Sequence, residues 1–288
     1  MSQRAALPLR HLLFAPADSE RKMQRAVASN ADMVILDLED SVAPDRKAEA
    51  RRQLSATLAD RGARPVAVRI NAADTAEHLA DLVAVVQAAP DCIMLPKCAR
   101  AGDVAILGHQ LAALECAASL AVGSIGILPL VTETAAALAS LDYRGASDRL
   151  VALAFAGEDL ASDLGVEART EGELNPLLVT ARHRVSIAAA AAGLPAIDTP
   201  FPDPRDGEGR EAADAARLGF AGKLCIHPDQ IGPVGLAFTP GVGRVAWAEA
   251  VVAAIGQDDG PGVAVVMGRM VDKAHLHLAR RIIAGARP

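Results

Sequence analysis

The chain of 288 residues is poor in aromatic side chains, with five Phe, one Tyr and one Trp. Hydrophobic residues still make up 51% of the sequence, so its core must be mostly aliphatic, as where Ala-rich helices pack on a sheet of branched side chains. The chain also has no long run of Lys or Arg, and its net charge is −6. This charge pattern argues against a protein that binds nucleic acid through its phosphates.

Disulfide, zinc and membrane signals are missing as well. The four cysteines, Cys92, Cys98, Cys116 and Cys225, do not have the paired spacing of a zinc site. A chain of this length can build its core without disulfides, so we interpret them as thiols in a reducing compartment. Charged residues and prolines interrupt the apolar stretches well before the length of a membrane span, and the N-terminus has no apolar signal core. We therefore expect a soluble, cytoplasmic protein.

Short apolar segments alternate with helical patterns along most of the chain. The eight expected strands are Leu12–Pro16, Asp32–Leu38, Pro65–Ile70, Cys92–Leu95, Ile125–Val131, Leu150–Phe155, Leu194–Thr199 and Gly222–Ile226. Eight such units over about 240 residues predict an α/β fold of the (β/α)8 TIM-barrel type. An open, doubly wound sheet is the alternative, but no glycine-rich phosphate-binding turn follows the first strand.

The pattern changes after residue 238. A helix over Val242–Ala254, a loop, a short strand over Val263–Val266 and a final helix over Asp272–Ile283 follow the eighth strand. We predict a TIM-barrel catalytic domain over residues 1–238 and a C-terminal lid or oligomerisation segment over residues 239–288.

Two of the expected strands run directly into acidic residues. Glu133 follows Ile125–Val131, and Glu158 with Asp159 follows Leu150–Phe155. Carboxylates beside buried apolar strands need a positive partner, and the carboxyl edge of a parallel barrel is where a Mg²⁺ site is built. Alternatively, Glu133 and Asp159 cap the helices that follow.

Polar residues recur at the same end of the other strands. They are Asp37, Glu39, Asp40, Arg69, Asn71, Lys97 and Asp198. Because the catalytic groups of a TIM barrel lie at that edge, the recurrence favours an active site over scattered helix caps.

Several of these segments, taken in chain order, resemble the citrate lyase β-subunit-like proteins of the HpcH/HpaI aldolase superfamily, which include malyl-CoA and citramalyl-CoA lyases. The matching residues are 10–16, 31–42 (ADMVILDLEDSV), 68–71 (VRIN), 95–97 (LPK), 133–134 (ET), 157–160 (GEDL) and 222–228 (GKLCIHP). The resemblance covers nearly the whole chain. It implies a TIM-barrel lyase that uses Mg²⁺ to cleave or form a carbon–carbon bond next to an acyl thioester.

Site residues follow from this resemblance. Glu133 and Asp159 match the metal ligands, and Arg69 matches the arginine that binds the α-keto acid. The resemblance implies substrate contacts for Glu39, Asp40, Gly157 and Glu158, and contacts of Ser19 and Lys22 with the coenzyme A phosphates.

Met270-Val271-Asp272 matches a segment whose acid reaches an active site, often that of a neighbouring subunit, and family members are commonly trimers. Asp272 is also placed to cap the last helix. Two residues depart from the family pattern, Ala17 after Pro16 and Met267 before Gly268.

The expected function is cleavage of a 3-hydroxyacyl-CoA thioester, such as citryl-, malyl- or citramalyl-CoA, into an acyl-CoA and an α-keto acid, or the reverse. Three alternatives remain: a malyl-CoA-type thioesterase on the same scaffold, a pyruvate-type aldolase acting on free acids, and a non-catalytic subunit that binds an acyl-carrier partner.

Overall fold

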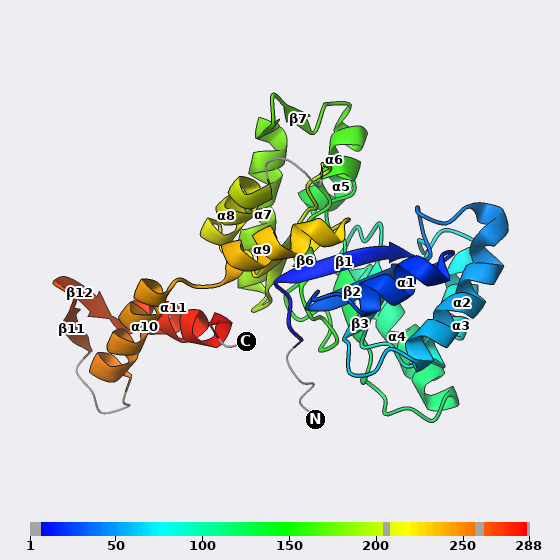
Figure 1. Cartoon of the computed structure of the whole chain (residues 1–288), viewed down its shortest axis with the longest axis horizontal. Coiled ribbons are helices and arrows are strands. Elements are labelled where there is room, and N and C mark those ends of the chain that lie inside the picture. The colour runs from blue at the N-terminus through cyan, green and yellow to red at the C-terminus, as the bar shows by residue number, and fades with distance from the viewer. Residues whose placement is uncertain (1–6, 204–207, 257–261, 287–288) are drawn as a thin grey trace. The chain divides into compact units, whose positions relative to one another are not determined.

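The computed structural model describes residues 7–203, 208–256 and 262–286. The chain forms two compact units, residues 1–234 and 235–288 (Figure 1). The division falls four residues before the expected boundary, inside a short helix, α9, Ile231–Phe238.

A parallel sheet of eight strands forms the centre of the first unit. Its strands are β1 (His11–Pro16), β2 (Met33–Asp37), β3 (Val66–Arg69), β4 (Cys92–Leu95), β5 (Gly126–Pro129), β6 (Leu153–Ala154), β9 (Ala196–Asp198) and β10 (Gly222–Cys225). The order is β5-β4-β3-β2-β1-β10-β9-β6. Two parallel bridges, Ile127 to Leu150 and Leu130 to Ala154, join the outer strands, so the sheet closes into the predicted TIM barrel.

The barrel interior is filled by aliphatic and small side chains. They are Leu12, Met33, Ile35, Ala67, Cys92, Met94, Leu128, Leu130, Ala152, Ala154, Ala156, Ile197 and Leu224. The aromatic ring of Phe14 packs against this cluster from one end. Alternate residues of each strand point to opposite faces, so the intervening residues pack under the helices, and both faces of the strands are apolar. This explains why the strands are recognisable in the sequence as continuous hydrophobic runs.

Helices surround the barrel. Those described are α1 (Glu20–Val27), α2 (Lys47–Ala59), α3 (Glu77–Val86), α4 (Ala101–Ala117), α5 (Ala135–Ala139), α6 (Gly157–Leu164), α7 (Pro176–Ala191), α8 (Glu208–Arg217) and α9, with short 3₁₀ turns at Pro44–Arg46 and Pro228–Gln230. Asn175 caps α7 by accepting a hydrogen bond from the Leu177 backbone N–H, and Pro176 occupies the first helical position.

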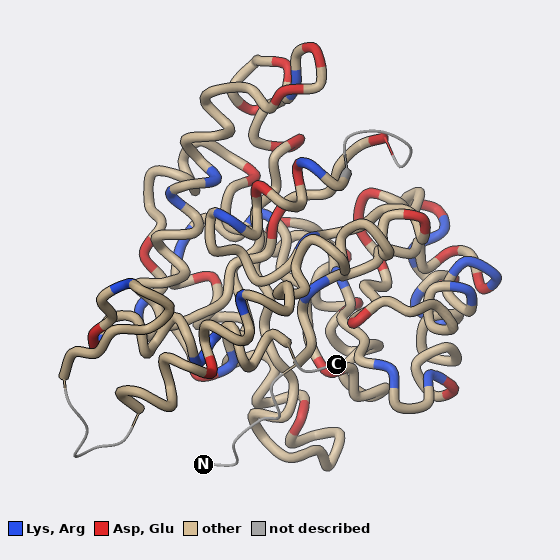
Figure 2. Tube along the Cα trace, turned by 60° about the vertical axis from the view of Figure 1, so that its left-hand side comes forward, with Lys and Arg blue, Asp and Glu red and all other residues tan. Residues whose placement is uncertain are grey.

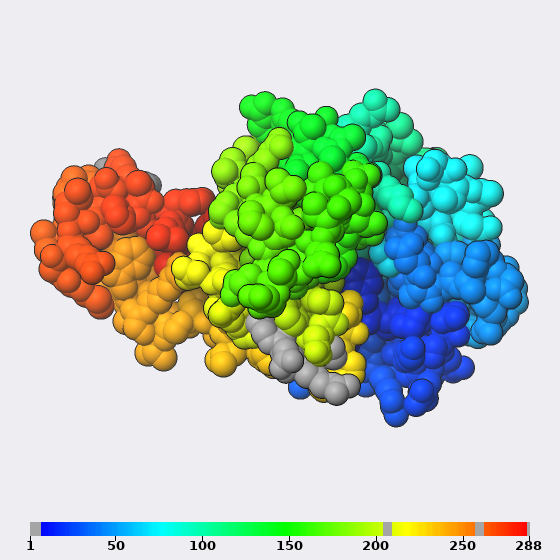
Figure 3. Space-filling view, turned by 90° about the horizontal axis from the view of Figure 1, so that it is seen from above, coloured from blue at the N-terminus to red at the C-terminus, as the bar shows by residue number. Residues whose placement is uncertain are grey.

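The connection from β6 to α7 contains additional secondary structure. Helix α7 ends just before β9, so α7 is the barrel helix that lies between the strands β6 and β9 in the chain. Helix α6 and an antiparallel hairpin, β7 (Arg169–Thr170) with β8 (Glu173–Leu174), form an additional excursion between β6 and α7. The green residues of this excursion lie on the face shown in Figure 3.

The second unit is a helical pair that carries a hairpin. Helices α10 (Val242–Ile255) and α11 (Lys273–Gly285) share an apolar cluster with strands β11 (Val263–Val266) and β12 (Arg269–Asp272). Met267 and Gly268 form the two-residue turn, with φ values of +50° and +78°. Hairpins of this length favour Asn, Asp or Gly at both turn positions, so Met267 is an unfavourable residue there. No described helix has the length and apolarity needed to cross a membrane.

Candidate active site

The carboxyl ends of β2 and β3 bring a cluster of charges together. Figure 2 shows acidic and basic residues interspersed along the trace, and at this edge opposite charges are directly paired. Arg69, the last residue of β3, donates two hydrogen bonds of 2.7 Å to the two carboxylate oxygens of Asp37. Its guanidinium also lies 5.0 Å from the centre of the Phe14 ring. Arg69 is therefore held in one orientation at the top of the barrel interior.

These contacts shift the pKa of both partners. Burial alone would raise the pKa of Asp37, but the hydrogen bonds and charge of Arg69 lower it below its ordinary value. Burial would lower the pKa of Arg69, but Asp37, with the charges of Glu39 and Asp40, raises it. Both groups are therefore ionised. Of the three acids near Arg69, Asp37 forms the bidentate pair, whereas Glu39 lies 3.1 Å and Asp40 lies 3.6 Å from its Nη1 atom.

Glu39 connects Arg69 to the loop after β4. Its second carboxylate oxygen lies 3.4 Å from Lys97 Nζ. Burial raises the pKa of Glu39 to about 7, although the charges of Arg69 and Lys97 oppose this shift. Asp40, by contrast, has a side chain that is 61% exposed and is free to face solvent or a bound molecule.

Glu133 has a buried carboxylate oxygen without a partner in the part of the chain that the structure describes, which indicates that a bound group completes the site. One carboxylate oxygen accepts a hydrogen bond from the Lys97 backbone N–H. The other, Oε1, is buried and has no hydrogen-bond partner among the described residues. Burial, together with the negative charges of Glu39 and Asp159, raises the pKa of Glu133 to about 8. The ionised form of this buried side chain is unfavourable unless a positive group binds beside it.

Asp159 completes the cluster from the next strand. It is the third residue of α6, is exposed, and its side chain forms no hydrogen bond or ion pair within the described ranges. The charges of Asp159, Glu39 and Arg69 all act on the pKa of Glu133, so the four groups lie close together. Of the polar residues expected at this edge, Glu39, Arg69 and Asp159 therefore lie near Glu133.

The donor set of this cluster suits a hard cation. Glu133 and Asp159 offer only carboxylate oxygens, and Mg²⁺ commonly takes one or two protein carboxylates and keeps several waters. Across the described residues, no group of three or more His, Cys, Asp and Glu side chains has the arrangement of a metal centre. The residues fit Mg²⁺ better than zinc, which needs three or four protein ligands.

The remaining candidate residues lie around this cluster or farther along the chain. Gly157 is buried and donates its backbone N–H to Thr199 Oγ1 at 2.9 Å. Glu158 is exposed and pairs with Arg169 from the β7–β8 hairpin. Ser19 occupies the N-cap position of α1 without forming a cap hydrogen bond, and Lys22 is exposed on the same helix.

Asp198 does not belong to the cluster. Its neighbour Ile197 faces the barrel interior, so Asp198 faces the helix layer, where it is completely buried. There it binds Arg182 of α7 with hydrogen bonds of 2.9 and 2.7 Å and Lys223 of β10 at 2.7 Å. The prediction that Asp198 contributes to the active-site edge is therefore wrong.

Lys47 is a residue of the site that the sequence did not reveal. Its buried Nζ donates to the backbone oxygens of Leu38 and Glu39 at 2.6 and 2.7 Å and to Asn71 Oδ1 at 2.7 Å. It thereby fixes the loop that carries Glu39. A lysine at the start of a helix is usually a surface residue, so no local signal marked it.

Asp272 lies in the second unit, at the N-cap of α11. Its carboxylate accepts a hydrogen bond from the Ala274 backbone N–H at 3.0 Å and lies 2.8 Å from His275 Nδ1. The hydrogen bond from His275 lowers the pKa of Asp272. The capping interpretation is confirmed, and the carboxylate form is the one present at neutral pH.

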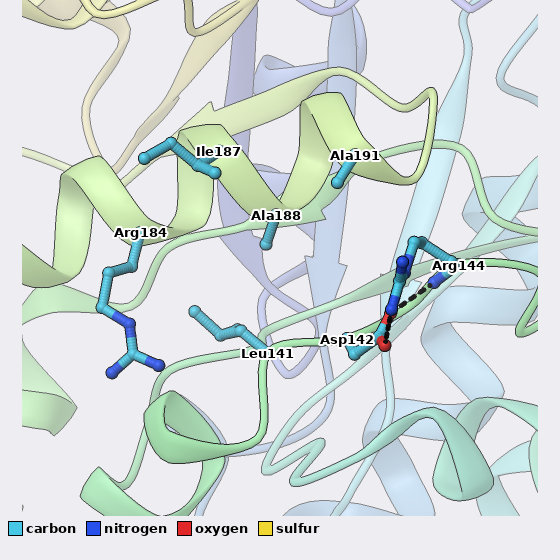
Figure 4. A pocket seen from close by; sticks show the side chains of 7 residues that line it. All are labelled: Leu141, Asp142, Arg144, Arg184, Ile187, Ala188 and Ala191. Atoms are coloured by element: carbon cyan, nitrogen blue, oxygen red, sulfur yellow. Dashed lines mark hydrogen bonds and ion pairs between the residues drawn. The ribbon is translucent and has the colours of Figure 1, made fainter.

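A surface hollow of about 290 Å³ lies at the opposite edge of the barrel (Figure 4). It is lined by the loop before β6, including the paired Asp142 and Arg144, and by the C-terminal half of α7. Helix α7 runs against the strands, so its last residues lie near their amino ends. This hollow is therefore separate from the Glu133 cluster.

Comparisons with known proteins decide the family. The model of the HpcH/HpaI aldolase/citrate lyase family matches residues 10–228. This chain is a member of that family. The matched range contains Arg69, Glu133 and Asp159, and it ends before the second unit begins.

Individual relatives of this family extend over the second unit. A (3S)-malyl-CoA thioesterase of Cereibacter sphaeroides (strain KD131 / KCTC 12085) is 35% identical, over 98% of this chain and 95% of the relative. The mitochondrial citramalyl-CoA lyase of Rattus norvegicus is 31% identical, over 98% of this chain and 87% of the relative. The crystal structure of CitE from Mycobacterium tuberculosis in complex with magnesium, acetoacetate and coenzyme A matches with a TM-score of 0.76 and 34% identity, over 98% of this chain and 99% of that one.

Proposed function

We propose that this family member is a Mg²⁺-dependent carbon–carbon lyase. It cleaves a 3-hydroxyacyl-CoA thioester of the citryl-, malyl- or citramalyl-CoA type into an acyl-CoA and an α-keto acid, or catalyses the reverse reaction. The observation that carries the proposal is the buried, unpartnered Oε1 of Glu133 beside Asp159 and Arg69. The relatives named citramalyl-CoA lyase and CitE support the substrate class.

Glu133 and Asp159 would hold the metal. Mg²⁺ in this position supplies positive charge that stabilises negative charge developing on the oxygens of the substrate. Arg69 binds the carboxylate or carbonyl oxygen of the keto-acid part through Nη1, which Asp37 does not use and which lies beside Glu39 and Asp40. Because Asp37 and Phe14 fix Arg69 before substrate arrives, little reorganisation is needed when charge develops.

The reaction requires two proton movements. Loss of the hydroxyl proton of the substrate breaks the adjacent carbon–carbon bond and leaves an α-keto acid and a thioester enolate. A proton must then reach the enolate carbon, and Asp272 is the proposed donor; in the condensing direction, its carboxylate removes this proton. The lowered pKa of Asp272 keeps it ionised at neutral pH, which is the form that the second role requires. Ser19 and Lys22, on one side of α1, are proposed contacts for the coenzyme A phosphates.

Hydrolysis of the thioester is the second candidate, because the relative at 35% identity is named a (3S)-malyl-CoA thioesterase. The two reactions give different products. Cleavage of malyl-CoA yields a keto acid and leaves the thioester intact, whereas hydrolysis yields a free thiol and malate. We expect purified full-length protein with Mg²⁺ to release keto acid first, measured with a coupled dehydrogenase, while a thiol reagent detects no early free coenzyme A.

Release of free thiol without keto acid would contradict the lyase activity and support the thioesterase activity. Turnover of free malate or citramalate without coenzyme A would support the pyruvate-type aldolase. Activity of the purified chain on a thioester would exclude a non-catalytic subunit that only binds an acyl-carrier partner.

We also propose that the second unit acts as a lid and that the protein assembles as a homotrimer. The hairpin of this unit exposes Val263, Val265 and Met270 on one face, and Asp272 lies on that same face of β12. Exposed apolar patches of this kind are common at interfaces. Light scattering at micromolar concentration should report three times the monomer mass of 29.7 kDa. A monomeric mass under these conditions would contradict the assembly.

A further inference from the structure

Helix α6, which carries Asp159, has no cap of its own. The N-cap residue is Ala156, which provides no side-chain hydrogen bond to the first turn. Instead, the N–H of Gly157 at the first helical position donates to Oγ1 of Thr199, at 2.9 Å. Thr199 follows β9, 42 residues farther along the chain. The start of α6 is therefore fixed by a neighbouring strand rather than by its own sequence.

The contact between Gly157 and Thr199 is close. A Cβ atom at position 157 would lie 3.1 Å from Thr199 Cγ2 and 3.2 Å from Thr199 Oγ1, which is tighter than ordinary van der Waals contact. A glycine at this position allows the backbone of α6 to approach the threonine side chain. The orientation of the first turn of α6 thus depends directly on where Thr199 is held.

A buried lysine, Lys223, fixes the backbone of Thr199. Lys223 is completely buried, and its Nζ donates to the Thr199 backbone oxygen at 2.6 Å, to Asp198 at 2.7 Å and to Glu211 at 2.8 Å. An ammonium group has three N–H donors, so each has one acceptor. Compared with apolar packing, a buried ionic network of this kind contributes little net stability, and its main effect here is to fix geometry.

The same network reaches α6 by a second route. Glu211 also accepts hydrogen bonds from Arg169 at 3.1 and 3.2 Å, and Arg169 pairs with Glu158. The two residues immediately before Asp159 are therefore both tied to Lys223, one through Thr199 and the other through Glu211 and Arg169. The side chain of Asp159 itself has no hydrogen bond or ion pair within the described ranges, so these contacts set its position.

We propose that Thr199, held by Lys223, is a positioning residue that aims the Asp159 carboxylate for metal binding. This inference rests on the proposed role of Asp159 as a metal ligand. Loss of the Thr199 hydroxyl leaves the N–H of Gly157 unpaired and lets the first turn of α6 move. The carboxylate is unchanged chemically but is no longer held toward Glu133, so metal affinity falls.

The test is the affinity of the full-length protein for Mn²⁺, measured from the electron paramagnetic resonance signal of the free ion. Thr199→Val keeps the shape of the side chain and removes the acceptor, and we expect affinity about threefold to tenfold weaker, the usual worth of one buried hydrogen bond. Thr199→Ser restores the hydroxyl and should bind within about twofold of the wild type. Thr57→Val is the matched control, because it removes a buried hydroxyl that donates to the Gln53 backbone oxygen within α2.

The outcomes separate this inference from the proposed function. If Asp159→Asn abolishes Mn²⁺ binding but Thr199→Val binds as tightly as the wild type, the positioning role is wrong and the metal site stands. If Asp159→Asn binds Mn²⁺ normally, both are wrong. If Thr199→Val does not fold, Gly157→Ala serves instead, since its new methyl group would push α6 away from Thr199. Weaker Mn²⁺ binding by Gly157→Ala supports the role, and unchanged binding overturns it.

Discussion

Glu133→Gln and Asp159→Asn should each reduce Mg²⁺-dependent turnover by at least about 100-fold, toward the level of the wild type in EDTA. Each substitution removes a negative charge and preserves the side-chain volume. The amide oxygen introduced by Glu133→Gln can still accept the Lys97 backbone N–H, and Asp159 is exposed, so the fold should persist. Steady-state rates over a Mg²⁺ titration, with circular dichroism as a check on folding, measure the effect.

Asp142→Asn provides the matched control for these variants. Asp142 is an exposed acid paired with Arg144 at the opposite edge of the barrel, so its substitution should leave turnover unchanged. Full turnover of the wild type in EDTA, or of either Glu133→Gln or Asp159→Asn, would end the metal hypothesis.

Asp272→Asn should lower turnover by about 10²–10⁴-fold while metal and keto-acid binding remain normal. The amide cannot exchange a proton with the enolate carbon as a carboxylate does. Asn can still accept the Ala274 backbone N–H, so it preserves the cap of α11 and thermal unfolding should hardly change. The most direct measurement is exchange of acetyl-CoA or propionyl-CoA protons with deuterated water in the presence of a keto-acid analogue.

Exchange separates the catalytic role of Asp272 from its capping role. The wild type should exchange these protons, and Asp272→Asn should not. Exchange by the variant at the wild-type rate would leave Asp272 as a helix cap only, and the proton carrier would then lie on the barrel edge.

Much of the barrel is predictable because its strands are buried on both faces. Runs such as Ile125–Val131 are apolar throughout, and they mark strands even where the hydrogen-bonded segment is as short as Leu153–Ala154 in β6. The parallel arrangement then gathers their carboxyl ends, which is why Glu133 and Asp159 can be paired from sequence. Their closeness follows from the fold class rather than from any local pattern.

Other features depend on information that short segments do not carry. The β7–β8 hairpin has two-residue strands and a turn at Glu171 and Gly172, both at positive φ, and Glu is not a residue that signals such a turn. Thr199 contacts Gly157 across 42 residues, and no spacing rule predicts this contact. The prediction for Asp198 is wrong because a position at a strand end does not show to which face the side chain points. Successive side chains of a strand point to opposite faces, so Asp198 points away from the barrel interior.

The proposed chemistry takes place at Glu133, Asp159 and Arg69. A crystal of the full-length protein soaked with Mn²⁺ and pyruvate tests it most directly, because the anomalous signal of manganese locates the metal. We expect one Mn²⁺ bound by the carboxylates of Glu133 and Asp159, with the pyruvate carboxylate or carbonyl oxygen on Arg69. Manganese bound elsewhere, or pyruvate bound away from Arg69, would contradict it.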